Sequence, residues 1–308
     1  MFDWIKFFPL AMKDDHKPSE VRGPYFPKPK KVKWCFGDSE LYFKAPRSNP
    51  VFSLSGRGWS LDKLIPKNKD LLPPRFTSPP NAGHWDNPVT RWSYSRFYSN
   101  EWFFLGPWFT GVQARLGMGA CLLETSHLSP FFKKNMFHPK VFESAVASIL
   151  DCRYGHHDFN TKKKAHFRGP LNWRVIPISN SIQAAVCDVH CVGNGTVDDP
   201  VVYRKIYIPI TSSHILNINF DFTGADLKND TVRAKPLLAL CNSIIDSIRL
   251  YVGPETQAEW DKVKATCPDM SITETFGELQ WPLAPEKPPK KKREVDITPA
   301  SSELKRIG

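Results

Sequence analysis

Two short stretches bring together residue types that can do chemistry. The first is His156-His157-Asp158, which lies between Cys152 and His166. Imidazole and carboxylate groups bind zinc. However, adjacent histidines point to opposite sides of an extended chain, and the spacing matches no known ligand pattern. We therefore expect a solvated loop here, and a protein without a bound metal or cofactor.

The second stretch is Cys187-Asp188-Val189-His190-Cys191. On a strand, Cys187, Val189 and Cys191 share one face, while Asp188 and His190 lie on the other. A cysteine nucleophile needs a histidine that reaches its sulfur, and His190 points away. The sequence therefore favours core-facing thiols, and we identify no catalytic residue.

Two glycine pairs have some features of phosphate-binding loops. Gly117-Met118-Gly119 and Gly193-Asn194-Gly195 both lack the lysine, the threonine or the third glycine that such loops use. We interpret both pairs as turns.

Aromatic side chains crowd residues 90–124. Trp102, Phe104, Trp108 and Phe109 lie in this stretch, which glycines interrupt. One interpretation is a β core built from large side chains. The other is an aromatic groove that binds a partner and stacks bases beside arginines. We name these four residues as candidate binding residues; the two interpretations differ in whether the rings are exposed.

A basic loop supplies the other candidate binding residues, Lys162, Lys163, Lys164 and Arg168. Their functional interpretation is contact with phosphate groups, and the alternative is a charged loop in solvent. The chain carries a net charge of +11. Much of this excess lies at the ends, because residues 1–34 hold eight Lys/Arg against four Asp/Glu and residues 286–308 hold seven against four. We expect the folded body to be only mildly basic.

The chain is organised around a hairpin and the helix that follows it. Val201–Ile210 and Ser213–Phe222 alternate apolar and polar residues, which predicts two strands with one buried and one solvated face. Apolar residues at spacings of three and four then predict a helix over Lys235–Val252. Asp230 or Thr231 is expected to cap its start.

The rest of the chain predicts further short elements. Short connections between successive strands imply an antiparallel meander. The predicted fold class is therefore α+β, an antiparallel sheet packed against helices, with a Pro-rich and aromatic-rich N-terminal extension. The elements are a strand pair over Val32–Phe43, two or three strands in 90–124, a helix over His138–Cys152, strands Trp173–Ile178 and Ser181–Val192, a helix stop at Gly253-Pro254, a short helix Gln257–Lys264 and a final strand in Ser271–Trp281.

We expect one main domain over residues 34–281, β-rich in 34–130 and helix, β meander, helix in 131–281. Residues 1–33 form a basic arm rich in proline and aromatic residues, and residues 282–308 form a flexible tail rich in proline and lysine. Seven cysteines without a CxxC motif indicate free thiols in a reducing compartment. Since no secretory signal or membrane-spanning apolar run occurs, we expect a soluble cytoplasmic protein.

The strand Ile215–Phe222, the loop after it and the helix ending in Cys241–Leu250 carry a family resemblance. With the elements before them, over residues 138–252, they resemble the PsbP-like α/β/α sandwich, as in bacterial DcrB-like proteins. The resemblance covers about a third of the chain. It implies a non-catalytic binding scaffold, since some members are adaptors for secreted bacterial toxins. No functional residue carries over, because that fold has no shared catalytic set.

Three functional hypotheses follow. The first is a non-enzymatic protein that binds an acidic protein partner, such as an immunity protein or effector adaptor in a bacterial toxin–antitoxin or type VI secretion system. The second is a nucleic-acid-binding protein that uses the basic loop and the tail. The third is an enzyme whose site residues are dispersed along the sequence. None of them involves a membrane, and the sequence leaves the oligomeric state open.

Overall fold

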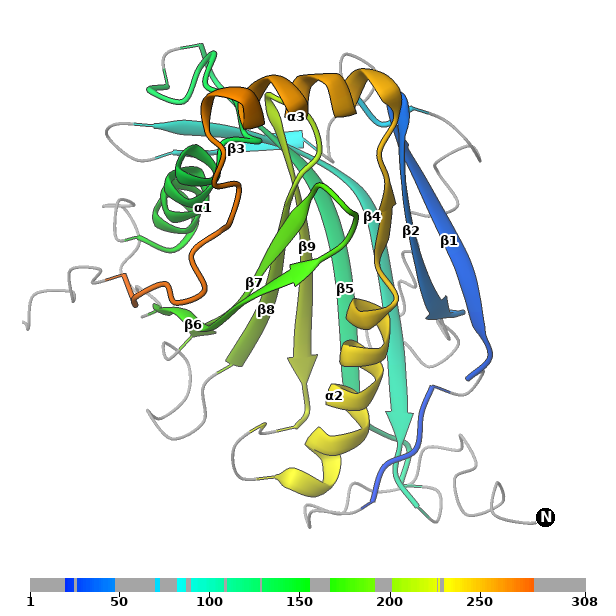
Figure 1. Cartoon of the computed structure of the whole chain (residues 1–308). Helices are drawn as coiled ribbons and strands as arrows, with labels where there is room; N and C mark the ends of the chain where they lie inside the picture. Colours follow the sequence, from blue (N-terminus) through cyan, green and yellow to red (C-terminus); the bar gives the residue numbers. More distant parts are fainter. Residues whose placement is uncertain are drawn as a thin grey trace, which may run out of the picture.

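Two antiparallel sheets and three helices make up the part of the chain that the computed structural model describes (Figure 1). This part comprises residues 20–24, 27–47, 70–72, 82–86, 90–107, 110–127, 129–155, 167–191, 201–225, 227 and 230–279. The strands are β1 (Pro29–Phe36), β2 (Ser39–Pro46), β3 (Ala82–Asp86), β4 (Arg91–Leu105), β5 (Val112–Thr125), β6 (Phe167–Pro177), β7 (Gln183–Cys191), β8 (Val201–Pro209), β9 (His214–Thr223) and β10 (Arg249–Tyr251). The helices are α1 (Pro139–Tyr154), α2 (Thr231–Asp246) and α3 (Pro254–Thr266).

The larger sheet has seven strands in the order β3-β4-β5-β9-β8-β7-β6, all antiparallel to their neighbours. The four strands from β6 to β9 form the predicted meander, and β9 joins it to the long hairpin β4–β5. The predicted central hairpin is confirmed, with Ile206 of β8 opposite Ile218 of β9. Pro209, which has no N–H for a ladder, is the last residue of β8. The α+β class is therefore confirmed.

One face of the large sheet is covered by α2 together with the three-stranded sheet β1-β2-β10 (Figure 1). Cys241 and Ile244 of α2 are fully buried in one cluster with Ile206 and Ile218. The ring of Trp34 in β1 lies edge-on to aromatic rings of β4 in the same cluster. This face is a closed apolar core.

The opposite face is covered by α1 and by residues 267–279, which we call the C-terminal strap. Phe142 and Ile149 of α1 are buried with Tyr207 of β8 and Ile215 of β9. The strap follows α3 and lies alongside α1 and the edge of the sheet (Figure 1). Together, α1 and the C-terminal strap cover one end of this face of the sheet.

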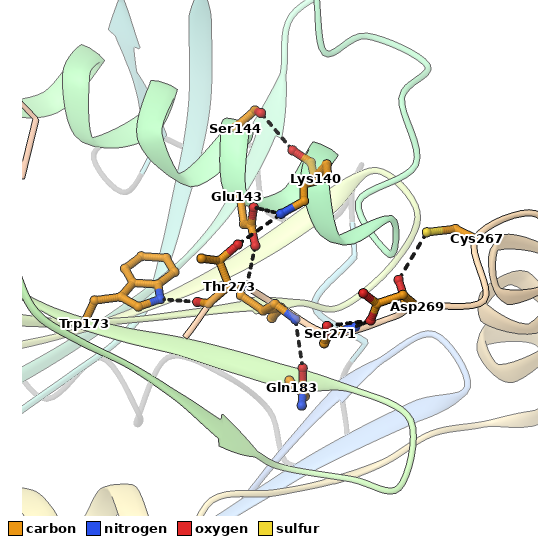
Figure 2. Close-up of polar contacts among 10 residues, drawn as sticks. Lys140, Glu143, Ser144, Trp173, Gln183, Cys267, Asp269, Ser271 and Thr273 are labelled. Atoms are coloured by element: carbon orange, nitrogen blue, oxygen red, sulfur yellow. Dashed lines mark hydrogen bonds and ion pairs between the residues drawn. The ribbon is translucent and has the colours of Figure 1, made fainter. Parts of the chain in front are cut away.

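Hydrogen bonds from side chains hold the strap in place (Figure 2). Thr273 N–H donates to the Glu143 carboxylate of α1 over 2.5 Å, and the Thr273 carbonyl accepts from Trp173 Nε1 of β6 over 2.8 Å. Ile272 N–H donates to Gln183 Oε1 of β7 over 3.3 Å. The strap is therefore attached to three elements at once.

The predicted final strand over Ser271–Trp281 is wrong for its described residues. Leu279 alone forms a bridge there, with Gly169. The backbone groups of the strap bond to side chains of α1, β6 and β7 instead of to a strand edge, so no ladder forms.

The predicted helix after the hairpin is present but ends early. α2 begins after Asp230, as expected, and ends at Asp246 rather than at Val252. The Ser247 hydroxyl caps the end, and Arg249–Tyr251 forms β10, which pairs with β2. Pairing with a strand far away in the sequence outweighs the helical spacing of the local residues.

Three glycines differ from the predictions. Gly253 stands before the first turn of α3 instead of stopping the preceding helix. Gly117 and Gly119 lie inside β5 and not in a turn. The other predicted elements are present with bounds shifted by a few residues. No helix in the described ranges is long and apolar enough to cross a membrane.

Candidate functional site

The sheet face that α1 covers changes character along its strands. Beyond the apolar part, β8 and β9 present Lys205, Asn217 and Asn219. Cross-strand pairing places Lys205 beside Asn219, and Asn219 beside Gly119 of β5. The alternating sequence predicts that this face is solvated, yet Lys205 is only 7% exposed and Asn217 only 3%. Polar positions that the pattern assigns to solvent are buried here, which marks a candidate site.

These residues form the floor of a cavity of about 160 Å³, which we call the Lys205 pocket. A cavity of ~150 Å³ is large enough to hold a benzene molecule. The pocket therefore has room for a small organic molecule. Its other lining residues are Trp85, Arg96, Ala120, Cys121, Arg153, Tyr154, Phe167 and Tyr203.

A glycine keeps the floor of the pocket open. A Cβ on Gly119 would meet no atom closer than the Tyr98 carbonyl oxygen, at 3.8 Å. The next position on the same face of β5 is Gly117, where an oxygen of the Asp221 carboxylate lies 2.4 Å from the site of a Cβ. The hollow therefore exists at Gly119 and is closed by Asp221 at Gly117.

Aromatic rings surround the positive charges of the pocket. Lys205 Nζ lies 5.3 Å from the ring centroid of Tyr154 and 5.6 Å from that of Tyr203. The Arg153 guanidinium lies 5.4 Å from the ring of Trp85 and 5.8 Å from that of Tyr154. Such distances give cation–π attraction. The rings thus stabilise cations in a place where burial disfavours them.

The pocket carries positive charge that its own residues do not balance. Arg96 and Arg153 are exposed at its mouth, and Lys205 is buried at its floor. None of its described lining residues is an acid. Within the described residues, no ion pair joins these three cations to a carboxylate. Asp221, on the same sheet face, is bound to Arg115 over 2.9 Å.

Burial lowers the pKa of Lys205 to about 7, and the Arg153 guanidinium acts in the same direction. Near neutral pH the amine therefore exists in both its charged and its neutral form. Burial raises the pKa of the Cys121 thiol to about 11, in spite of the nearby cations. Cys121 is thus protonated at neutral pH and is not an activated nucleophile. The Oδ1 atom of Asn219 is buried and has no hydrogen-bond partner among the described residues.

The residues predicted to bind a partner lie elsewhere. Trp102 and Phe104 are both 0% exposed, and Trp102 Nε1 donates to the Pro46 carbonyl over 3.1 Å. The β-core interpretation holds for these two, and neither ring is available at the surface. Arg168 is exposed at the start of β6 and pairs with Glu278 of the strap over 2.9 Å. The other predicted binding residues, Trp108, Phe109, Lys162, Lys163 and Lys164, lie outside the described residues.

The two stretches whose residue types can do chemistry contribute no described residue to the Lys205 pocket. Cys187 and Val189 are buried beneath α1, while Asp188 binds Arg204 on the other sheet face, as the alternation predicts. The imidazole cluster at residues 156–166 lies outside the described residues.

Sequence reasoning missed the pocket, although part of its signal was visible. The alternation places Lys205 between Tyr203 and Tyr207 on one strand face, opposite two asparagines. A lysine among aromatic and amide residues is unusual for an ordinary solvated face. The sequence does not reveal that Arg153, at the end of α1, stands over this face.

Comparison with known proteins gives no family for this chain. No family model matches it, and neither a curated protein nor a solved structure does so. The resemblance of residues 138–252 to the PsbP-like sandwich therefore stays a prediction.

Proposed function

We propose that the protein binds a small organic anion in the Lys205 pocket and acts as a binding protein. The observation that carries this proposal is the convergence of Arg96, Arg153 and Lys205 without an acidic lining residue among those described. A buried charge is costly unless it is paired. A bound carboxylate or phosphate supplies the missing partner.

The lining also indicates the shape of the ligand. Tyr154, Phe167 and Tyr203 offer aromatic surface, and the cavity of about 160 Å³ fits a body of roughly ring size. Lys205 is placed to bind the anionic group at the floor, and Asn219 offers an unpaired acceptor for a donor on the ligand. An aromatic or similarly sized organic acid satisfies both features.

The test is isothermal titration calorimetry with benzoate and phenyl phosphate as probes and neutral benzamide as the uncharged counterpart. Lys205→Met removes the central charge but keeps an unbranched side chain. We expect it to weaken anion binding at least tenfold, ~1.4 kcal/mol, because the ligand loses a charge-assisted hydrogen bond. Lys262→Met, on the exposed face of α3, is the matched control and should bind as the wild type does.

A second variant tests the cavity without touching its charge. Gly119→Val places a branched side chain, which suits a strand, into the pocket floor. We expect it to block both anions, while Gly277→Val, where a Cβ would meet no atom of the described residues within 4 Å, leaves binding unchanged. The proposal would be refuted if the wild type bound neither anion. It would also be refuted if Lys205→Met and Gly119→Val bound the anions as tightly as the wild type does.

A second candidate function is catalysis by the Lys205 amine, as in the hypothesis of an enzyme with dispersed residues. The lowered pKa of Lys205 favours it, because a neutral amine is a nucleophile. With a 2-oxo acid, the nitrogen would form a C=N bond to the carbonyl carbon, and the carbonyl oxygen would leave as water. Pyruvate with borohydride, which reduces the C=N bond, should then leave a stable adduct on the peptide that contains Lys205. Pyruvate binding without an adduct would exclude this chemistry and leave the binding function standing.

The acidic protein partner expected from the sequence, with an immunity or adaptor role, remains a separate proposal. Trp102 and Phe104 cannot support it in this structure, because both are buried. An acidic side chain of such a partner would meet Arg96 and Arg153 at the pocket mouth. Both proposals therefore use the same two positive charges. Loss of binding to a captured partner in Lys205→Met would connect them.

A further inference from the structure

The outward face of the three-stranded sheet β1-β2-β10 has a composition unlike that of its inward face. Its inward residues are apolar and buried, such as Trp34 and Phe43. Its outward residues form three cross-strand rows, set by the register of the strands. The rows are Lys31 beside Lys44, then Lys33 beside Tyr42 and Arg249, then Cys35 beside Glu40 and Tyr251. We call this surface the outer sheet face.

Two tyrosines lie at the centre of the outer sheet face. Their rings meet edge to face, with centroids 5.2 Å apart and an interplanar angle of 87°. Tyr251 is 63% exposed, which is unusual for so large a ring. Lys31 Nζ lies 3.7 Å from the ring centroid of Tyr42. The centre is therefore an aromatic surface bordered by ammonium groups.

The outer sheet face is strongly positive. Lys31, Lys33, Lys44 and Arg249 are all exposed. Glu40 is the one acid among its described residues, and it is already engaged by Lys33 and by the hydroxyl of Tyr42. Lys31 stands directly opposite Lys44. Like charges in that position destabilise a sheet, and a bound polyanion would relieve this repulsion.

We propose that the outer sheet face binds single-stranded nucleic acid. Bases stack on exposed aromatic rings, while phosphates are neutralised by lysines and arginines placed around the rings. Tyr251 and Tyr42 supply the first element, and Lys31, Lys44 and Arg249 supply the second. The proposal does not depend on the Lys205 pocket, since the two sites share no residue.

A single strand fits this surface better than a duplex or an acidic protein. The bases of a duplex are stacked on each other and cannot reach a tyrosine ring, so a duplex would use the lysines alone. An acidic peptide would also use the lysines but would leave the tyrosine pair without a partner. Only a single strand uses both features at the same time.

The experiment is fluorescence anisotropy with a fluorescein-labelled oligothymidylate of about ten nucleotides, within the ~4–16 that one binding surface covers. Tyr251→Ala removes an exposed ring and should weaken binding about tenfold with an unchanged salt dependence. Lys31→Gln with Lys44→Gln should weaken binding and reduce the slope of log K against log salt by about 1.4. These two variants separate stacking from charge.

Lys134→Gln with Lys262→Gln is the matched control, because it removes two exposed charges from other surfaces. It should bind the oligonucleotide with nearly the affinity of the wild type. The proposal is overturned if the control loses as much affinity as the sheet variant, or if Tyr251→Ala has no effect. It is also overturned if a duplex of equal length binds as tightly, if polyglutamate displaces the strand at equal charge, or if no binding occurs at low salt.

Discussion

The two faces of β8 and β9 are built from alternate residues of the same strands, yet they meet different neighbours. On the α2 face, Ile206 and Ile218 are fully buried in an apolar core. On the α1 face, Lys205 and Asn219 line a cavity. Both faces also hold a cation, the half-buried Arg204 on the first and the buried Lys205 on the second. The difference lies in whether that cation has a partner.

Arg204 forms an ion pair with a carboxylate and one further hydrogen bond. Its Nε and Nη2 atoms donate to the two carboxylate oxygens of Asp188 over 2.8 and 3.1 Å, and Nη1 donates to Asn242 Oδ1 over 3.1 Å. Lys205 has aromatic rings around it but no carboxylate partner among the described residues. Arg204 is paired within the protein, whereas the lack of a carboxylate beside Lys205 among the described residues is the basis for the proposed binding of an anion. The two faces thus differ in whether their cation forms an ion pair.

The largest effect should come from removing the carboxylate partner of Arg204. Asp188→Ala leaves the half-buried Arg204 guanidinium without its carboxylate, and removal of one partner of a buried pair costs about 3–5 kcal/mol. Urea denaturation should show a lower free energy of unfolding by that amount. Asp188→Asn, which keeps an oxygen acceptor in place, should lose less. If Asp188→Ala were as stable as the wild type, the α2 face would not depend on this pair.

A smaller effect should come from releasing the strap on the α1 face. Glu143→Ala leaves the Thr273 N–H without its acceptor, at a cost of about 1–3 kcal/mol. Hydrogen exchange should quicken at the strap while the α2 face stays protected. Ser144→Ala is the control, since its hydroxyl bonds only within α1 and is exposed. Equal exchange in both variants would mean that Glu143 does not hold the strap.

Glu143 also predicts a response to acid. Burial raises the pKa of this carboxyl, but hydrogen bonds from Thr273 and Lys140 outweigh that effect, and the pKa is lowered overall. The stabilisation by Glu143 is therefore complete above the ordinary glutamate pKa of 4.5 and is lost as pH falls through the lower folded value. Protection factors at the strap, which remove the intrinsic pH dependence of amide exchange, should fall below about pH 4.5 in the wild type, with a weaker pH response in Glu143→Ala.

Sequence reasoning recovered the faces of the strands but not what covers them. The alternation over 216–222 identifies the strand β9 and assigns Asn217 and Asn219 to one side. It cannot tell whether that side meets water or a neighbouring element. The end of α1, together with Trp85 and Phe167, lines the pocket over that side, and these residues come from distant parts of the sequence. The pattern therefore predicted solvent where the fold makes a pocket.

The same limit explains the misplaced helix end and the misplaced turn. Ile248 and Tyr251 continue the helical spacing, so local information favours a longer helix. Pairing of β10 with β2 is a tertiary event that this spacing does not encode. Gly119 signals a turn when it is considered alone, but in β5 it leaves room for the pocket. The sequence therefore did not reveal site residues at positions where tertiary contacts override local secondary-structure preferences.

The last effect is the pH dependence of Lys205, which has no carboxylate partner among the described residues. The folded pKa of Lys205 is about 7 and its ordinary value is 10.5, so between these values the unfolded chain binds more protons. The contribution of Lys205 to the free energy of unfolding therefore rises with pH across this window, by at most ~1.4 kcal/mol per pH unit. Lys205→Met has no such proton to lose, and without ligand it should be the more stable protein at pH 7. Thermal unfolding of both proteins from pH 7 to 10 isolates this difference, because cysteine and tyrosine titrations are common to the two. Parallel curves would mean that Lys205 is solvated in the folded protein, and the contrast between the two faces of β8 and β9 would then rest on their packing alone.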